Sequence, residues 1–67
     1  MKITELKNKS SLTRKAVLYS EKYLNGDTWY RVDVINIDKR GYETLKYQMP
    51  FRNHKAAEHY LEIALKE

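Results

Sequence analysis

Apolar and polar side chains alternate over residues 28–38, in the middle of the chain. Successive side chains of a strand point to opposite faces, so this segment would have one apolar face and one mixed face. The apolar face carries Tyr30, Val32 and Val34, and the mixed face carries Trp29, Arg31, Asp33, Ile35 and Ile37. We therefore predict that residues 28–38 form the central strand of a small sheet.

A strand-like segment precedes Asn25-Gly26, and this dipeptide is the strongest local signal for a two-residue type I′ hairpin. Such a turn would place Val17 opposite Val34. Val17 and Tyr19 would then lie on the same side of the sheet as the apolar face of the central strand.

A second turn is predicted over residues 38–41, which begin with aspartate and end with glycine. If all four residues form the loop, Val34 pairs with Leu45. A three-residue loop would instead place Lys46 opposite Val34, on the core side, so we favour the longer loop. The third strand then adds to the apolar face Leu45, Tyr47, Met49 and Phe51.

Asn53 suits a helix cap, because its side-chain oxygen can accept a hydrogen bond from a free backbone N–H. A helix is predicted over residues 54–66. Its apolar residues are Ala56, Ala57, Tyr60, Leu61, Ile63, Ala64 and Leu65. At about 100° per residue they span roughly 200° of the helix circumference, more than one sheet face needs. We expect residues 1–12 to cover the remaining flank, and the alternative is a second subunit.

The first 13 residues are rich in lysine, and Ile3 and Leu6 have helical spacing. Residues 1–13 are therefore expected to be a basic N-terminal segment or to contain a short helix over residues 3–8. Residues 14–67 would form a single β-β-β-α domain. The predicted fold is α+β, a three-stranded antiparallel meander with one C-terminal helix packed on one face.

Composition adds limits to this picture. A chain of 67 residues is one domain with one small core. The absence of cysteine fits a reducing compartment. No apolar run is long enough to cross a bilayer, and the first residues lack the apolar stretch of a secretion signal. We therefore expect a cytoplasmic protein that does not use a membrane.

The formal net charge of +4 draws attention to basic residues on the mixed face. In the predicted register, Lys22 lies opposite Trp29 and Arg31 lies opposite Gln48, with Lys46 on the same face. Such side chains neutralise phosphates and bind base edges, and tryptophan stacks on bases. The alternative is that Trp29 only covers the aliphatic stem of a basic neighbour.

Other basic residues lie outside the predicted strands. Lys39 and Arg40 are in the second turn, and Arg52 and Lys55 flank the start of the predicted helix. A helix N-terminus with free N–H groups favours a phosphate. The alternative for each of these residues is an ordinary solvated surface position.

The chemistry of enzymes is not evident in this chain. His54 and His59 are five residues apart, about 140° around a helix, so they cannot share a metal ion. We find no glycine-rich phosphate loop, no nucleophile with a base, and no carboxylate pair in a pocket. We expect no catalytic residues, no metal site, no cofactor and no enzymatic activity.

Two families have a similar order of elements. Three strands and a helix, with Trp29-Tyr30-Arg31 opening the middle strand and a helical end over residues 51–66, resemble the arm-type DNA-binding domains of tyrosine recombinases. This resemblance implies that the free sheet face enters the major groove. The order is also similar to that of the double-stranded-RNA-binding domain, and Lys55 matches part of its lysine-rich motif.

Two functional hypotheses follow, from different classes. The first is a small nucleic-acid-binding module of phage or mobile-element origin, which binds DNA in preference to RNA as a monomer or weak homodimer. The second is a phage-type inhibitor or adaptor, which binds a host protein through the face around Trp29 or by adding a strand at an edge of the sheet.

Overall fold

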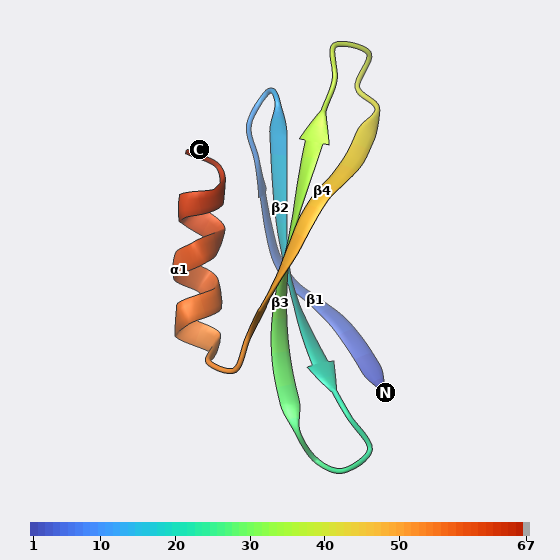
Figure 1. Cartoon of the computed structure of the whole chain (residues 1–67), viewed down its shortest axis with the longest axis vertical. Helices are drawn as coiled ribbons and strands as arrows, with labels where there is room; N and C mark the ends of the chain where they lie inside the picture. Colours follow the sequence, from blue (N-terminus) through green and yellow to red (C-terminus); the bar gives the residue numbers. More distant parts are fainter. Residues whose placement is uncertain (67) are drawn as a thin grey trace.

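The computed structural model describes residues 1–66 of the 67-residue chain. Its elements are β1 (Lys2–Ser10), β2 (Arg14–Lys22), β3 (Thr28–Ile37), β4 (Glu43–Phe51) and α1 (His54–Ala64). The strands form an antiparallel sheet in the order β1-β2-β3-β4, and α1 packs on one face (Figure 1). We call this face the helix side and the opposite face the open face. The α+β class was predicted, but the prediction of a three-stranded meander was wrong, because the sheet has four strands.

The additional strand is β1, which pairs with the edge of β2 that faces away from β3. The short helix predicted over residues 3–8 was therefore wrong. An isolated helix of six residues is marginal in water, whereas strand pairing provides hydrogen-bond partners for this backbone along β2. Ile3, Leu6 and Leu12 remain exposed, so they do not cover the flank of α1.

The β2–β3 hairpin has a three-residue loop in place of the predicted two-residue turn. The N–H of Gly26 donates to the carbonyl of Tyr23 at 3.0 Å, and the N–H of Tyr23 donates to the carbonyl of Asp27 at 2.9 Å. Gly26 has a φ of 92°. This is the pattern of a type I turn followed by a left-handed residue. The side-chain oxygen of Asn25 supports the loop by accepting from the N–H of Asp27 at 3.0 Å.

The extra loop residue turns every side chain of β2 to the face opposite the predicted one. Ala16 and Leu18 lie on the helix side and are fully buried, and Leu18 pairs with Val32. Val17 and Tyr19, which we predicted to face the helix, point to the open face. The Asn-Gly dipeptide located the hairpin but did not define its loop length, since both loop types need a residue with positive φ.

The β3–β4 hairpin has the same loop geometry. The N–H of Gly41 donates to the carbonyl of Asp38, and the N–H of Asp38 donates to the carbonyl of Tyr42, both at 3.0 Å. The carboxylate of Asp38 also accepts from the N–H groups of Arg40 and Tyr42 at 2.8 and 3.0 Å. The loop between these paired residues therefore has three residues, and the predicted four-residue loop was wrong.

We had rejected a three-residue loop because it would place Lys46 in the core, but a β-bulge in β4 prevents this. Ile35 pairs with Leu45, but the next pair is Val34 with Tyr47, so Lys46 is an extra residue without a partner on β3. The bulge returns Tyr47 to the helix side, as predicted, and keeps the lysine out of the core. Leu45, which we predicted for the core, lies on the open face and is 53% exposed.

The core lies between the helix side of the sheet and α1. Its fully buried residues are Ala16, Leu18, Val32, Val34, Ala57, Leu61 and Ala64. Partly buried aromatic residues surround them, among them Tyr47 and Tyr60, whose hydroxyl oxygens are 2.5 Å apart. The apolar face predicted for the central strand thus packs, as does part of that predicted for the helix, whereas Ala56 and Ile63 are exposed.

The predicted cap of α1 is confirmed. The side-chain oxygen of Asn53 accepts hydrogen bonds from the N–H groups of Lys55 and Ala56 at 2.8 and 3.2 Å. The helix ends at Ala64, two residues before the predicted end. Among residues 1–66, no helix is long and apolar enough to cross a bilayer.

One ion pair connects β1 to α1. The ammonium group of Lys9 donates a hydrogen bond to the carboxylate of Glu62, and this contact lowers the pKa of Glu62. A lowered pKa means that the pair stabilises the fold at neutral pH and that this contribution is lost as the pH falls through the lowered pKa. Both side chains are exposed, so the contribution is small.

The loop geometry leads to a prediction for the two glycines. Gly26 and Gly41 have φ values of 92° and 88°, and a methyl group at either Cα would meet no atom within 4 Å. The cost of Gly26→Ala or Gly41→Ala therefore comes from backbone strain alone, and we expect each to lower the free energy of unfolding by about 1–2 kcal/mol. Chemical denaturation measures this change in the free energy of unfolding. A change below about 0.5 kcal/mol, within the range of an ordinary surface substitution, would contradict the left-handed assignment.

Candidate nucleic-acid interface

The structure distributes the nine predicted contact residues over both faces and both ends of the sheet. The open face carries Trp29, Arg31 and Gln48, and the helix side carries Lys22. The bulge of β4 contains Lys46, and the tip of the β3–β4 hairpin contains Lys39 and Arg40. The start of α1 is flanked by Arg52 and Lys55. Lys22 pairs with Thr28 and not with Trp29, because of the one-residue change in register. The residues therefore do not form the single patch that we predicted from the sequence.

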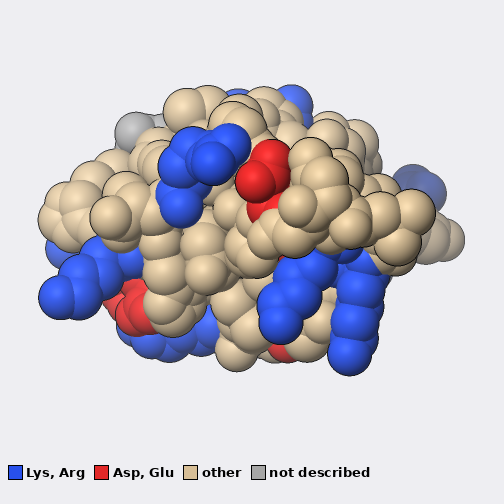
Figure 2. All heavy atoms as spheres, turned by 90° about the horizontal axis from the view of Figure 1, so that it is seen from below, with Lys and Arg blue, Asp and Glu red and all other residues tan. Residues whose placement is uncertain are grey.

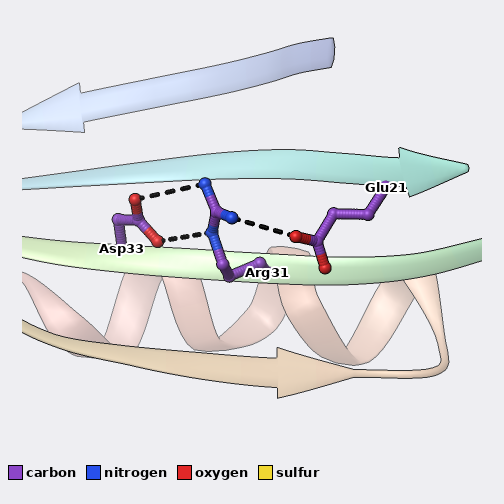
Figure 3. Close-up of polar contacts among 3 residues, drawn as sticks. All are labelled: Glu21, Arg31 and Asp33. Carbon is purple, nitrogen blue, oxygen red and sulfur yellow. Dashed lines mark hydrogen bonds and ion pairs between the residues drawn. The ribbon is translucent and has the colours of Figure 1, made fainter. Parts of the chain in front are cut away.

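Arg31 lies at the centre of an ion-pair cluster on the open face (Figure 3). Its Nη1 donates to the carboxylate of Glu21 at 2.9 Å, and its Nε donates to that of Asp33 at 2.8 Å. Its guanidinium group also stacks over the ring of Tyr19, at 4.7 Å from the ring centroid. One arginine between two carboxylates leaves this cluster with a formal charge of −1, which repels phosphates.

Trp29 lies on the same face, nearer the end of the sheet that carries the β2–β3 hairpin. The guanidinium carbon of Arg52 is 4.3 Å from the centroid of its ring. Our alternative for Trp29, that it covers the stem of a basic neighbour, named Lys22 or Arg31. The residue that it contacts is instead Arg52, from the segment between β4 and α1.

The two edge strands have features that oppose strand addition. β1 has a register shift between Glu5 and Lys7, and β4 has the bulge at Lys46 and a proline, Pro50, near its end. Bulges, lysines and proline are the common means by which edge strands avoid pairing with other chains. Binding of a partner by strand addition therefore has less support than binding to a face.

A pocket of about 310 Å³ lies on the helix side of the sheet, beyond the start of α1. Its lining residues are Lys2, Thr4, Leu6, Ser20, Lys22, Thr28, Tyr30 and His54. Six of these come from two neighbouring rows across β1, β2 and β3, namely Lys2-Lys22-Thr28 and Thr4-Ser20-Tyr30. Of the two lysines here, only Lys22 was predicted from the sequence, because the position of Lys2 depends on the unpredicted strand β1.

Four basic side chains lie at this end of the molecule. Lys2 and Lys22 lie at the pocket, and Arg52 and Lys55 lie at the start of α1. None of the four makes an ion pair with a residue in the described part of the chain. We call these four residues the basic end. Figure 2 views the molecule from this end, where Lys and Arg side chains project on several sides and cover more of the surface than Asp and Glu side chains do.

The other predicted basic residues lie elsewhere. Lys39 and Arg40 are at the opposite end of a molecule that is 42 Å long (Figure 1). His54 is at the pocket wall, where its ring contacts that of Tyr30 at 5.1 Å and its Nε2 lies 3.1 Å from a carboxylate oxygen of Glu58. Because of the length of the molecule, a single phosphate cannot contact both the basic end and the β3–β4 hairpin tip that carries Lys39 and Arg40.

Metal chemistry has no geometric support in the described part of the chain. Among residues 1–66, no group of three or more His, Asp or Glu side chains is arranged to hold a metal ion. Comparisons with protein-family models, curated proteins and solved structures found no match to this chain.

Proposed function

We propose that this protein is a small nucleic-acid-binding module that contacts phosphates with its basic end. The observation that carries this proposal is that Lys2, Lys22, Arg52 and Lys55 gather at one end of the fold without carboxylate partners among residues 1–66. Lysine and arginine contacts to phosphates supply most of the non-specific affinity of nucleic-acid-binding proteins.

The open face is less suited to this role than the sequence implied. The resemblance to recombinase domains assigned the contact to this face, with Arg31 as a central residue. Arg31 already donates to Glu21 and Asp33, so a phosphate would have to displace a carboxylate and approach the other. The proposal therefore keeps the predicted class of ligand and moves the contact from the middle of the open face to the end of the sheet.

Trp29 has a role in this proposal as a support for Arg52. Stacking on an indole restricts the guanidinium group, so less conformational entropy is lost when it binds a ligand. The N–H groups of Arg52 have no carboxylate partner among residues 1–66 and remain available to a phosphate. Trp29→Ala is expected to weaken binding through the loss of this support.

The experiment is a titration of labelled duplex DNA, duplex RNA and single-stranded DNA by fluorescence anisotropy over a series of salt concentrations. The test variant is Arg52→Gln with Lys55→Gln, and the control is Lys39→Gln with Arg40→Gln. Both variants lower the net charge by two, so long-range attraction changes equally and only the position of the charge differs.

We expect the logarithm of duplex affinity to fall with the logarithm of salt concentration, by roughly 0.9 for each phosphate contacted. In the test variant this slope should decrease by up to about 1.8, with at least about tenfold weaker binding, while the control stays close to wild type. Equal losses in the two variants would reject a contact at the basic end. Absence of binding to all three ligands at low salt would reject the proposed function.

A protein partner is the second candidate, and the open face is the observation that favours it. Trp29 and Arg52 are stacked there, and the apolar side chains of Ile3 and Leu45 are 46% and 53% exposed on the same face. Tryptophan and arginine are enriched among the residues that dominate binding energy in protein interfaces. Recovery of one protein in stoichiometric amount by the wild type, and its loss with Leu45→Lys, would support this function.

A further inference from the structure

We propose that the pocket beside the start of α1 binds a phosphomonoester, specifically the terminal phosphate of a nucleic-acid strand. The inference rests on the proposed function in one respect, that the phosphate belongs to a nucleic acid. The pocket itself is defined by residues from β1, β2 and β3 and by His54.

The first observation is the direct pairing of two lysines. Lys2 and Lys22 are opposite each other on β1 and β2, and both line the pocket. Like charges opposite each other in a sheet destabilise it. No acidic side chain lines the pocket, and neither lysine has an ion-pair partner in the described chain. An anion between the two ammonium groups would convert this repulsion into attraction.

The second observation is a hydroxyl group that opens into the pocket. Ser20 is only 8% exposed, and its hydroxyl makes no hydrogen bond with any residue that the structure describes. The oxygen is not sealed from solvent, because no buried side-chain oxygen or nitrogen among residues 1–66 lacks a partner. Because Ser20 lines the pocket between Thr4 and Tyr30, its hydroxyl is free to donate a hydrogen bond to a ligand oxygen there.

The donors around the pocket fit a phosphate better than a carboxylate. Two ammonium groups and three hydroxyls, those of Thr4, Ser20 and Thr28, come from three neighbouring strands, and donors spread in this way suit the oxygens of a tetrahedral group. No guanidinium group lines the pocket among residues 1–66, so the positive charge there comes from the two lysines, which bind phosphate as point charges.

Charge and size favour a terminal phosphate over an internal one. A phosphomonoester carries about −1.5 to −2 charges at pH 7, which matches two lysines, whereas an internal phosphodiester carries a single charge. The volume of about 310 Å³ is at the lower end of the range for small-molecule sites. It exceeds the space that a phosphate alone needs, and Leu6 and the ring of Tyr30 offer apolar surface for an attached sugar.

The experiment compares oligonucleotides of one sequence that carry a 5′-phosphate, a 3′-phosphate or neither, in anisotropy titrations with the full chain. Inorganic phosphate is the probe for a free source, with the melting temperature as readout. The test variants are Lys22→Gln and Ser20→Ala. Lys39→Gln is the matched control, since it removes the same charge at the far end of the molecule.

We expect a terminal phosphate to increase the affinity of the wild type by at least about tenfold. Lys22→Gln should abolish this increase, Ser20→Ala should reduce it and Lys39→Gln should retain it. Without phosphate, Lys22→Gln should melt at or above the wild-type temperature, because it removes the repulsion from Lys2. Ser20→Ala should melt close to the wild-type temperature, because its hydroxyl has no hydrogen-bond partner to lose among residues 1–66. If Lys22 or Ser20 had only a structural role, its substitution would instead lower the melting temperature.

The outcomes separate this inference from the proposed function. Equal binding of phosphorylated and unphosphorylated strands would overturn the pocket inference and leave the proposed function intact. If no strand binds, but inorganic phosphate raises the melting temperature of the wild type and not of Lys22→Gln, the pocket is an anion site and its assignment to nucleic acid is overturned. Absence of both effects would overturn both proposals.

Discussion

Replacing Leu18 with alanine is expected to lower the free energy of unfolding by about 2–5 kcal/mol. Leu18 is fully buried beside Val32, on the face of the sheet that α1 covers, as part of the core. The loss has two parts, the transfer free energy of the removed methyl groups and the cavity that remains. Urea denaturation followed by circular dichroism measures the change.

The matched control for this prediction is Leu24→Ala, the same substitution at a side chain that is 98% exposed in the β2–β3 loop. It should change stability by less than about 0.5 kcal/mol. A domain of this length is expected to have a total stability of only about 3–10 kcal/mol, so Leu18→Ala can unfold it entirely. In that case Leu18→Met, with an expected cost below about 1.5 kcal/mol, provides a measurable folded variant. If Leu18→Ala and Leu24→Ala had equal effects, the register of β2 would be wrong.

Replacing Arg31 with methionine is the second large effect, with an expected loss of about 2–3 kcal/mol. Methionine keeps much of the aliphatic volume but leaves the carboxylates of Glu21 and Asp33 without their donor. Their side chains are only 15% and 12% exposed, so water does not fully replace the lost hydrogen bonds. Denaturation at neutral pH measures the loss.

The control for Arg31 is a triple variant that also carries Glu21→Gln and Asp33→Asn. Removing both carboxylate charges should recover most of the lost stability, because the cost arises from unpaired charge more than from lost packing. Arg52→Met is a second control and should cost about 0.5–1 kcal/mol, since Arg52 stacks on Trp29 and makes no ion pair with residues 1–66. An Arg31→Met variant as stable as Arg52→Met would show that the cluster does not stabilise the fold.

Several parts of the fold were predictable because their signals are local. Asn53 caps the helix through its own neighbours, and the apolar residues of α1 and of β3 follow the periods of a helix and a strand. Such patterns depend on residues close together in the sequence. They identified the elements from residue 14 onward and the helix side of β3.

Loop length was the point at which local signals failed. Gly26 and Gly41 are needed in both short and longer hairpin loops, so their positions locate a turn but leave a choice of one residue. That choice reversed β2 completely, and with it the predicted contact between Lys22 and Trp29. On β4 the bulge at Lys46 compensated for the error, so Tyr47 faces the helix side as predicted.

The candidate site was less predictable than the fold. Lys22, Arg52 and Lys55 were named from the sequence, but Lys2 and Ser20 were not. Lys2 becomes part of a site only when β1 pairs with β2, and Ser20 belongs to no sequence motif that indicates a binding site. Conversely, Arg31 was predicted to bind a ligand, but it donates to two carboxylates. Asp33 is two residues along the same strand, whereas Glu21 reaches Arg31 only through the register of β2 on β3.

By itself, the sequence determined that this chain forms an antiparallel meander followed by one capped, amphipathic helix, because those features arise from neighbouring residues. Only the tertiary structure decided that β1 completes the sheet, which face each residue of β2 occupies, and that the four residues of the basic end lie together. The physical reason is that strand pairing joins residues distant in the sequence. A change of one residue in register costs little within a loop, yet it determines which side chains meet across the sheet.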